Sequence, residues 1–553
     1  MVAEKVVETD ILVLGGGIAG CFAAIKAKEQ GLDVTLVDKS YVGKSGSTYA
    51  AGMNFTVYNP ELGSDFDDTL KAVHAESDYL NNREWTEIVM KDSWTIYQDL
   101  VSWGVEFPVE EEKEGTFFKI YPPFVQARIV RRGVAPPLRK QALKVGVRIM
   151  DKIVVTDLLK NDGRVVGAIG FPVTGLDLYV FKAKATIVST GGWSLKAPGA
   201  DNHYLTGDGQ AMSYRAGAEL TGKDTFSAQP ASGVYPSWRG ARAARSVYRY
   251  YTDAEGVRIA HGYESDIGTD LAFHDGRGPI YHDLDAANTE DIERMWKRQQ
   301  KSDAMESERV GFDPRNRGKH LLSGVNTGTS IGGSIWPINT KCATTLPGLY
   351  AAGDSCGHKA AFWGGLVPGG VTGTRAGLGA AEYALQAEKP VIDEEELARA
   401  KKIMYAPAER KGGFSPRWVT QLLLNTMAPY YVLIIKHQKR LQAALSMVEF
   451  FRDHYVPKLF ANDSHELRLA HETRNAVLGS EMVLKTCLLR TESRAMNYRE
   501  DYPKRDDPAW LAWIKIKDEK GKMKLWKEPI PEKWWPDLSE PYEERYPKRL
   551  PGE

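Results

Sequence analysis

The sequence predicts an α/β protein whose first domain is built around a parallel sheet. Residues 8–14 (TDILVLG) are a short apolar run rich in β-forming residues, and residues 18–30 carry apolar residues at helical spacing. Gly31 ends that helix, and residues 32–38 (LDVTLVD) form a second strand. Strand, helix and strand in this order make a βαβ unit, the opening of a Rossmann-like domain.

The turn between the first strand and the first helix carries a glycine pattern, G-x-G-x-x-G, at Gly15, Gly17 and Gly20. Gly15 allows a tight turn, Gly17 lets the backbone approach a pyrophosphate, and Gly20 lets the helix pack close to the strand. The N-terminus of the helix offers N–H groups to phosphates, and Asp38 can accept hydrogen bonds from ribose hydroxyls. We therefore expect a dinucleotide site that also includes Ile18, Ala19 and Lys39.

Two downstream segments favour FAD over NAD as the dinucleotide. Gly348–Asp354 (GLYAAGD) is a strand followed by a glycine turn, and Gly353 and Asp354 are expected to face the ribityl chain or the pyrophosphate. Thr190, Gly191 and Gly192 end another strand. In flavoproteins the βαβ unit opens the chain and a distant segment completes the site around the flavin.

The rest of the chain divides by its composition. Residues 67–103 are expected to be helical, and residues 370–386 form a helix of small residues. We expect a Rossmann-like FAD-binding domain with an inserted α+β capping domain, followed by a helical domain and an extended C-terminal tail. The expected bounds are 1–230 with 321–392 for the FAD-binding domain, 231–320 for the capping domain, 393–490 for the helical domain and 491–553 for a Trp-rich tail that suits a subunit contact.

Charge and cysteine content exclude several classes of protein. Lys and Arg total 72 and Asp and Glu total 72, so no basic excess points to nucleic acid. The four cysteines form no C-x-x-C pair, which excludes a local iron–sulfur motif, and no metal site is expected. The sequence shows no signal peptide and no apolar stretch of about 18 residues, so we expect a cytoplasmic protein that does not span a membrane.

The chain resembles the flavoprotein subunits of succinate dehydrogenase and fumarate reductase, and their relative the adenylylsulfate reductase alpha subunit, whose pattern it follows more closely. TGDG and the ESR…DYP…DD run are the most specific of the matching pieces. The pieces are VLGGGIAG, SGSTYAAGMN (Ser45–Asn54), VSTGG (Val188–Gly192), LTGDGQAMSYRAGAEL (Leu205–Leu220), LYAAGDSCGHK (Leu349–Lys359) and ESRAMNYREDYPKRDDPAW (Glu492–Trp510).

The resemblance implies further contacts to FAD. They come from the matching segments and comprise Ser45, Gly46, Ser47, Gly52, Thr206 and Asp208. The relatives that attach FAD covalently do so through a histidine, and Ser47 stands at the matching place. Non-covalent FAD is therefore expected. The resemblance also implies an oligomer and a separate iron–sulfur or ferredoxin-like partner, because this chain lacks cluster ligands of its own.

Three departures concern the substrate. Gln229 stands where those enzymes have the histidine of F-H-P-T-G, and Phe362 stands where they have a proton-donating arginine. The stretch Asn326–Ile331 contains no counterpart of a second histidine. A dicarboxylate needs paired cationic donors, so succinate and fumarate are not expected as substrates.

The catalytic candidates come from two regions. His358 and Phe362 follow the flavin-proximal turn, and an imidazole that titrates near neutrality can donate a proton. Arg245 and Arg258 belong to an Arg- and Tyr-rich stretch that suits a small anionic organic or sulfur-containing substrate. The same stretch also suits a solvated basic face or a contact with an acidic partner.

The sequence leaves three functions open. The first is a flavoprotein subunit that passes hydride or electrons between FAD and a small anionic substrate. The second is a stand-alone ene-reductase or α,β-dehydrogenase. The third is a flavin subunit that only relays electrons.

Overall fold

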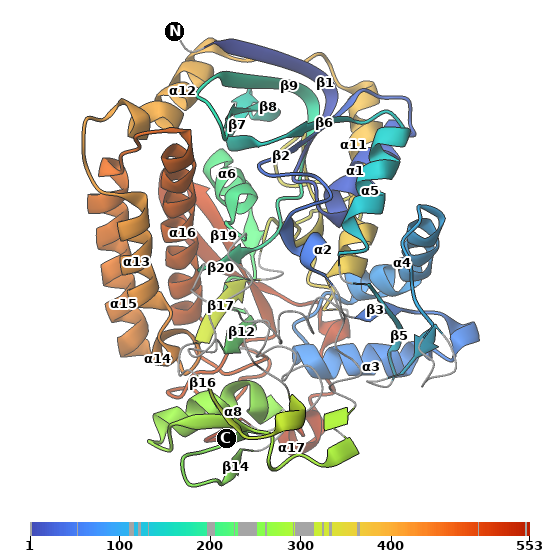
Figure 1. The fold of residues 1–553 in the computed structure, drawn as a ribbon, viewed down its shortest axis with the longest axis vertical. Helices are drawn as coiled ribbons and strands as arrows, with labels where there is room; N and C mark the ends of the chain where they lie inside the picture. The colour runs from blue at the N-terminus through green and yellow to red at the C-terminus, as the bar shows by residue number, and fades with distance from the viewer. Residues whose placement is uncertain are drawn as a thin grey trace.

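The structure is a computed structural model (Figure 1). The described residues are 3–51, 54–109, 116–119, 123–130, 132–195, 205–225, 227–230, 251–259, 263–290, 292–293, 314–322, 326–330, 334–361, 365–495, 497–547 and 550–553.

A sheet to which the described residues contribute seven strands forms the centre of the first domain. Across the sheet the order is β6 (Arg148–Asp151), β2 (Val34–Asp38), β1 (Glu4–Leu14), β9 (Leu178–Val188), β8 (Arg164–Pro172) and β7 (Ile153–Asn161), and β18 (Leu349–Ala351) also pairs with β9. β8 and β7 pair in antiparallel fashion, whereas β6, β2, β1, β9 and β18 are parallel. The carboxyl ends of the parallel strands therefore meet at one edge, where open α/β sheets bind their ligands.

The segment Leu349–Ala351 reaches the site by pairing with only the second half of β9. Leu349 lies opposite Thr186 and Ala351 opposite Val188, while β8 pairs with residues 179–182 of the same strand. Val188 and Ala351 thus end side by side. This pairing brings the two expected halves of the dinucleotide site together.

Helix α1 (Ile18–Lys28) packs against α11 (Leu366–Gln386) and against α5 (Ala135–Lys144) beside the sheet (Figure 1). The small residues of α11 permit a close approach, since a Cβ on Gly377 would lie 2.5 Å from the carbonyl oxygen of Ala23. The apolar run Ile11–Leu14 is fully covered in this core.

The helical stretch expected over residues 67–103 is two helices, α3 (Phe66–Ser77) and α4 (Arg83–Ser102). Asp78 ends α3 in the left-handed conformation, with φ of 46°. Asn82 then begins α4, because its side chain accepts a hydrogen bond from the N–H of Trp85. These cap residues explain why one periodic pattern produced two helices.

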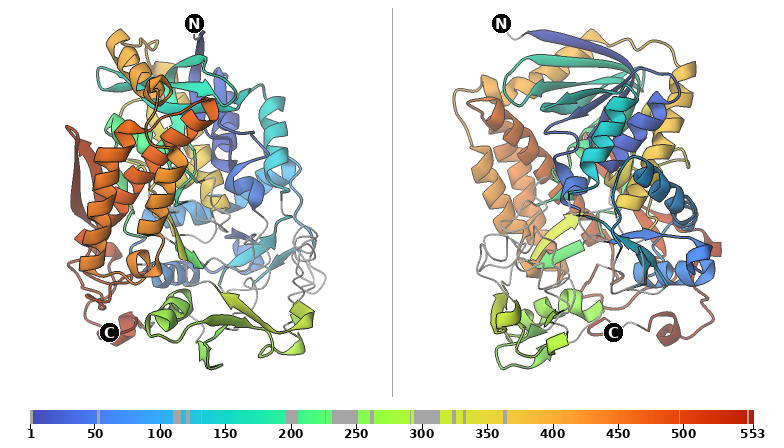
Figure 2. Two further views of the ribbon diagram at one scale, coloured as in Figure 1. Left: turned by 60° about the vertical axis from the view of Figure 1, so that its left-hand side comes forward. Right: turned by 45° about the vertical axis from the view of Figure 1, so that its right-hand side comes forward.

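A small unit lies at the opposite end of the molecule from the N-terminus (Figures 1 and 2). Its described residues form an antiparallel sheet and one helix. They are β14 (Arg258–Ile259), β13 (Tyr251–Thr252), β15 (Ile280–Asp283) and β16 (Lys319–Leu322), in that order, with α8 (Tyr263–His274). They fall within or beside the expected capping region, whose bounds stay a prediction. Elsewhere, β3 (Asn54–Val57), β5 (Val125–Arg128) and β4 (Phe117–Phe118) form a separate sheet.

Residues 393–490 are helical, as expected. The helices are α12 (Glu394–Glu409), α13 (Pro416–Met427), α14 (Tyr430–Leu433), α15 (Gln438–Phe450) and α16 (Ser464–Leu489). Figure 2 shows α13, α15 and α16 side by side. None of the described helices is both long and apolar enough to cross a membrane.

The C-terminal tail contains a hairpin that we did not expect. β19 (Ala512–Glu519) and β20 (Lys522–Pro529) pair with each other, and β19 also pairs with β11 (Leu220–Thr221). The alternating WIKIK and the Gly521 turn were the signal for it. The short helix α17 (Tyr542–Arg545) follows.

Candidate functional site

The glycine turn after β1 has the geometry that its sequence predicted. Gly15 has φ of +104°, and a Cβ there would lie 2.5 Å from the carbonyl oxygen of Ser189. A Cβ on Gly20 would collide with the carbonyl oxygen of Gly15. The turn therefore holds the N-terminus of α1 directly above the strand ends, with room that only glycine leaves.

Asp38 fixes this turn. The N–H of Gly16 donates to Oδ2 of Asp38 over 2.8 Å, and the N–H of Ser40 donates to Oδ1 over 2.7 Å. A carboxylate has about four acceptor positions, so Asp38 retains capacity for ribose hydroxyls. Thr48, in α2 (Gly46–Ala50), was not predicted from the sequence; its hydroxyl accepts the N–H of Ile18 over 2.9 Å.

The second segment lies against the first. Gly353 has φ of +62°, and a Cβ there would come within 2.7 Å of the Cβ of Ala19. The hydroxyl of Ser355 donates to the carbonyl oxygen of Gly191 over 3.1 Å. The structure thus unites Gly15–Gly20, Thr190–Gly192 and Gly353–Asp354, as predicted.

The surroundings of Asp354 show whether the site suits FAD, the dinucleotide that carries a ribityl chain. Burial raises its pKa to about 6. No described side chain pairs with its carboxylate, which lies near the start of α11, 3.6 Å from the place of a Cβ on Gly365. A half-buried acceptor without a donor suits the hydroxyls of a ribityl chain, so the residues fit FAD.

Lys39 joins the strand edge to two more segments. Its Nζ donates to Asp208 Oδ2 over 2.8 Å, to Glu472 Oε1 over 3.0 Å, and to the hydroxyl of Thr206. Burial opposes the charge of Lys39, but Asp208 and Glu472 outweigh it and raise its pKa. The structure brings Lys39 together with Thr206 and with Asp208, at the start of α6 (Asp208–Ala216), and with Glu472 of α16, which was not foreseen. Contact of these residues with FAD stays a prediction.

His358 differs from the expectation that its imidazole titrates near neutrality. Burial, helped by the neighbouring charge of Lys359, lowers its pKa to about 4. Its Nδ1 accepts the N–H of Ala360 over 3.0 Å, so the neutral ring carries its proton on Nε2. The ring lies 5.9 Å from that of Trp85. At neutral pH His358 is a neutral hydrogen-bond donor, and its catalytic role stays a prediction.

The remaining predicted site residues make fewer contacts with the glycine turn or lie outside the described residues. Ser45 begins α2 and donates to the carbonyl oxygen of Tyr41, Gly46 has φ of +75°, and Ser47 is exposed. Arg258 is exposed on β14, in the small antiparallel sheet. Gly52, Arg245 and Phe362 lie outside the described residues.

Two of the three departures from the family pattern that concern the substrate lie in paired strands. β12 (Ser227–Pro230) pairs with β17 (Asn326–Ser330) in antiparallel fashion, and Gln229 lies opposite Thr327. β17 also pairs with β10 (Trp193–Ser194), which follows the Thr190–Gly192 turn. The two stretches in which the resemblance places histidines of related enzymes therefore belong to one small sheet, which also contains β10.

Lys223 is a buried cation that the sequence did not reveal, because nothing in TGKDTF marks it as buried. Its side chain is 0% exposed, and its Nζ donates to Oε1 of Gln210. Burial lowers its pKa to about 7.

A buried ionic network was also missed, although it is built on the ESR…DD motif. Arg490 Nε donates to Asp224 over 2.6 Å, and Arg494 pairs with Glu492 over 2.8 Å. Arg505 pairs with Asp78 over 2.9 Å. The motif residues thus connect the tail to the first domain.

The tail tryptophans pack within this chain. Trp510 and Trp513 are each 5% exposed. Trp513 Nε1 donates to the carbonyl oxygen of Leu80 over 2.8 Å, and Trp510 Nε1 donates to the hydroxyl of Thr491 over 3.1 Å. Both side chains therefore belong to the fold, and a subunit contact through the tail stays a prediction.

Two family models match the chain. Residues 10–371 match the FAD binding domain, and residues 421–546 match the fumarate reductase flavoprotein C-term. The first match covers most of the chain and includes the glycine turn, Asp38 and Asp354.

Known proteins resemble the chain along nearly its whole length. A fumarate reductase (CoM/CoB) subunit of Methanothermobacter marburgensis is 28% identical, over 92% of this chain and 96% of the relative. Mycobacterium smegmatis Sdh1 in complex with UQ1 superposes with a TM-score of 0.83, at 23% identity and 98% coverage of both chains. Adenylylsulfate reductase from Archaeoglobus fulgidus superposes with a TM-score of 0.75, at 22% identity, over 96% of this chain and 97% of that one.

The solved structures show that the fold is shared, and the family match covers the residues that form the site. The chain belongs to the succinate dehydrogenase and fumarate reductase flavoprotein family and is an FAD-dependent oxidoreductase.

Proposed function

We propose that the chain is the flavoprotein subunit of a two-component enzyme. It transfers hydride or electrons between non-covalently bound FAD and a small anionic substrate other than succinate or fumarate, and it exchanges electrons with a separate iron–sulfur protein in the cytoplasm. The part of the proposal that concerns the substrate is supported by the pairing of Gln229 with Thr327. Neither residue supplies the cationic donor that a dicarboxylate needs.

The relative from Methanothermobacter marburgensis is named a fumarate reductase, and this name favours fumarate as the substrate of this chain as well. The residues argue against it, because Gln229, Phe362 and the stretch 326–331 replace the cationic groups that the family resemblance places there. A relative 28% identical leaves room for a different substrate on the same fold.

Bound FAD supplies a ring that accepts and returns electrons or hydride. The residues of this chain bind FAD and orient the substrate. Asp38 and Asp354 would accept hydrogen bonds from the sugar hydroxyls of FAD, and the N-terminus of α1 would hold its pyrophosphate. His358, neutral at pH 7, presents its Nε2–H as a donor that orients a substrate oxygen.

The proposed partner follows from the cysteines. Cys21, Cys342, Cys356 and Cys487 are all buried and unpaired, and the described residues hold no group of three His, Cys, Asp or Glu that could bind a metal ion. Electrons that leave the flavin one at a time therefore need a second protein. The relative from Methanothermobacter marburgensis is named as one subunit of its enzyme, which fits an assembly of several chains.

Stopped-flow reduction of the FAD-loaded chain tests the proposal. A reduced ferredoxin-like iron–sulfur protein should bleach the flavin absorbance, whereas fumarate should not reoxidise the reduced flavin. Reduction by a small molecule alone, with no response to the iron–sulfur protein, would show a stand-alone enzyme. Response to the protein with no substrate among small organic and sulfur anions would show an electron relay.

A further inference from the structure

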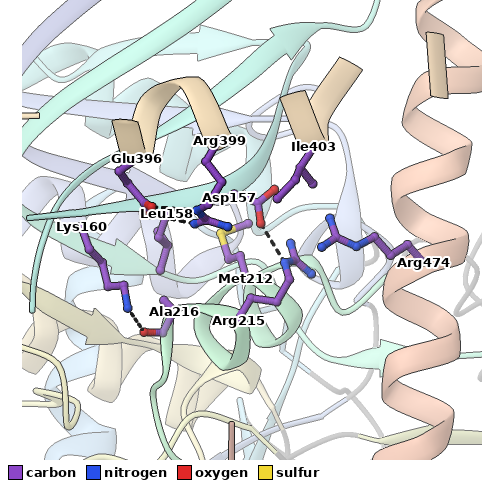
Figure 3. Close-up of a pocket in the computed structure, with 10 residues that line it drawn as sticks. All are labelled: Asp157, Leu158, Lys160, Met212, Arg215, Ala216, Glu396, Arg399, Ile403 and Arg474. Carbon is purple, nitrogen blue, oxygen red and sulfur yellow. Dashed lines mark hydrogen bonds and ion pairs between the residues drawn. The ribbon is translucent and has the colours of Figure 1, made fainter. Parts of the chain in front are cut away.

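A cavity of about 130 Å³ lies where the first domain meets the helical bundle, apart from the glycine turn (Figure 3). Its wall comes from β7, α6, α12 and α16. Figure 3 shows the side chains of Arg215 and Arg474 extending toward one another from α6 and α16. The charged residues of the wall are Asp157, Lys160, Arg215, Glu396, Arg399 and Arg474.

The cations of this wall outnumber its carboxylates by two. Arg215 Nε donates to Asp157 Oδ1 over 2.7 Å, and Arg399 pairs with Glu396 over 2.9 Å. Among the described residues, Lys160 donates only to a neutral carbonyl oxygen, that of Ala216. No described carboxylate forms an ion pair with Lys160 or Arg474, although the charge of Asp157 acts on Arg474 without a direct contact.

Arg474 shows the strain of this arrangement. Its Nη1 is buried and donates no hydrogen bond to any described residue. The charge of Arg215 and the loss of water lower its pKa to about 10, although Asp157 acts in the opposite direction. An arginine normally stays above about 12. Asp157 pairs with Arg215 and also attracts Arg474, but it offsets only part of the repulsion between the two guanidinium groups, and a further anion in the cavity would offset the rest.

The size of the cavity limits the anion. A volume of about 130 Å³ has room for a tetrahedral oxyanion of the size of phosphate or sulfate. Its oxygens match the paired N–H groups of guanidinium side chains.

We propose that this cavity is a binding site for a tetrahedral oxyanion, held by Arg474, Arg215 and Lys160 with Arg399 at its rim. The site is independent of the substrate proposed above, because its residues come from other elements.

A short path joins this site to the dinucleotide site. Arg215 Nη1 donates to Asn475 Oδ1 over 3.0 Å, and Asn475 Nδ2 donates to Asp208 Oδ1 over 2.9 Å. Asp208 accepts the hydrogen bond of Lys39 described above. An anion that holds Arg215 in place holds Asn475 and Asp208 with it, so the bound anion slows the loss of FAD. This second step rests on the position of the dinucleotide site.

Isothermal titration calorimetry of the FAD-loaded protein tests the site, with inorganic phosphate and with sulfate at constant ionic strength. Both should bind saturably at one site, with dissociation constants of about 1 mM or below, and each should compete with the other. Acetate and chloride, which lack the tetrahedral set of oxygens, should bind at least about tenfold more weakly. Arg474→Met should weaken phosphate binding at least about tenfold, and Lys140→Met, at an exposed position of α5, should leave it unchanged.

Arg399→Met protects the test from a folding defect, because the Arg399 side chain is 59% exposed. It should also weaken phosphate binding while flavin content stays normal. Absence of saturable binding to the wild-type chain would overturn the proposal, as would affinities of the Arg474→Met and Arg399→Met variants equal to that of the wild type. Phosphate should also slow FAD release, followed by flavin fluorescence on dilution, about fivefold in the wild type and not in Arg474→Met. Binding without that effect would keep the site and remove the link to FAD.

Discussion

Gln229 of β12 lies directly opposite Thr327 of β17 in an antiparallel pair. The resemblance places a histidine of related enzymes at Gln229 and a second one within the stretch Asn326–Ile331. The structure pairs the two strands that carry these positions, so both departures fall in the same small sheet.

Neither succinate nor fumarate should turn over. Removing one charged donor from a buried carboxylate site costs several kcal/mol, and here more than one is absent. Fumarate reduction with reduced viologen measures this, and bleaching of the bound flavin by viologen is the control for electron entry. Turnover at about 1 per second or faster would contradict the prediction.

FAD should be bound without a covalent link. Ser47, exposed in α2, offers a hydroxyl where covalent relatives offer an imidazole. Acid precipitation of the yellow protein should release the flavin into the supernatant. Ser47→Ala should retain the same flavin content, and colour that stays in the pellet would refute the prediction.

Gly17→Val should abolish FAD binding in a chain that still folds. Gly17 has ordinary backbone angles, φ −74° and ψ −172°, and a Cβ would meet only the hydroxyl of Thr48, at 3.3 Å. The added methyl groups instead fill the space that the pyrophosphate needs. Flavin content per chain measures the effect, with circular dichroism as the check of folding.

Gly175→Val is the matched control, because a Cβ there makes only an ordinary contact of 3.6 Å with Pro172, far from the site. This variant should keep its flavin. Full flavin occupancy in Gly17→Val would show that the pyrophosphate lies elsewhere.

FAD affinity should rise with pH and level off above about pH 6. Burial raises the pKa of Asp354 to about 6 without FAD, and donors from FAD favour its carboxylate form, so binding releases a proton below that pH. Affinity should be about tenfold weaker near pH 5 than at neutral pH. Fluorescence titration of FAD measures it, and Asp354→Asn should lose this dependence. An unchanged slope in the variant would assign the proton to another group.

Arg490→Met should lower the free energy of unfolding by about 3–5 kcal/mol, because it leaves Asp224 buried without its partner. The exposed pair Lys524–Glu519 is the control, and Lys524→Met should cost less than about 1 kcal/mol. Urea denaturation followed by tryptophan fluorescence compares them. Equal effects of the two substitutions would mean that the buried pair adds no more than a surface pair.

Arg490 outweighs burial and holds the pKa of Asp224 below its usual value. The stability that this carboxylate contributes is therefore present at neutral pH and is lost as pH falls through that lowered pKa. Arg490→Met should remove this part of the acid sensitivity.

The sequence predicted the features that depend on local pattern. The glycine turn, the βαβ unit and the helix of small residues each follow from residues close together in the chain. The sequence also predicted that Gly348–Asp354 lies in the same site as the glycine turn, although it did not specify the contact of Gly353 with Ala19.

The features that escaped prediction depend on contacts between distant segments. Glu472 pairs with Lys39 from the other end of the chain, and Ile516 pairs with Leu220 across β19 and β11. No local pattern specifies such partners. The pKa of His358 was misjudged for a related reason, since burial is set by the packing of Trp85 and the turn rather than by the residue itself.

The buried ionic network has a consequence for how the chain reaches its native state. Its carboxylates and guanidiniums come from four separate stretches, near residues 78, 224, 490–507 and 545–553. A guanidinium buried before its carboxylate arrives is strongly unfavourable, so a form with only one or two stretches docked gains nothing from closing early. The network therefore favours cooperative assembly of these stretches, because loss of any one of them leaves a buried charge of another stretch without its partner.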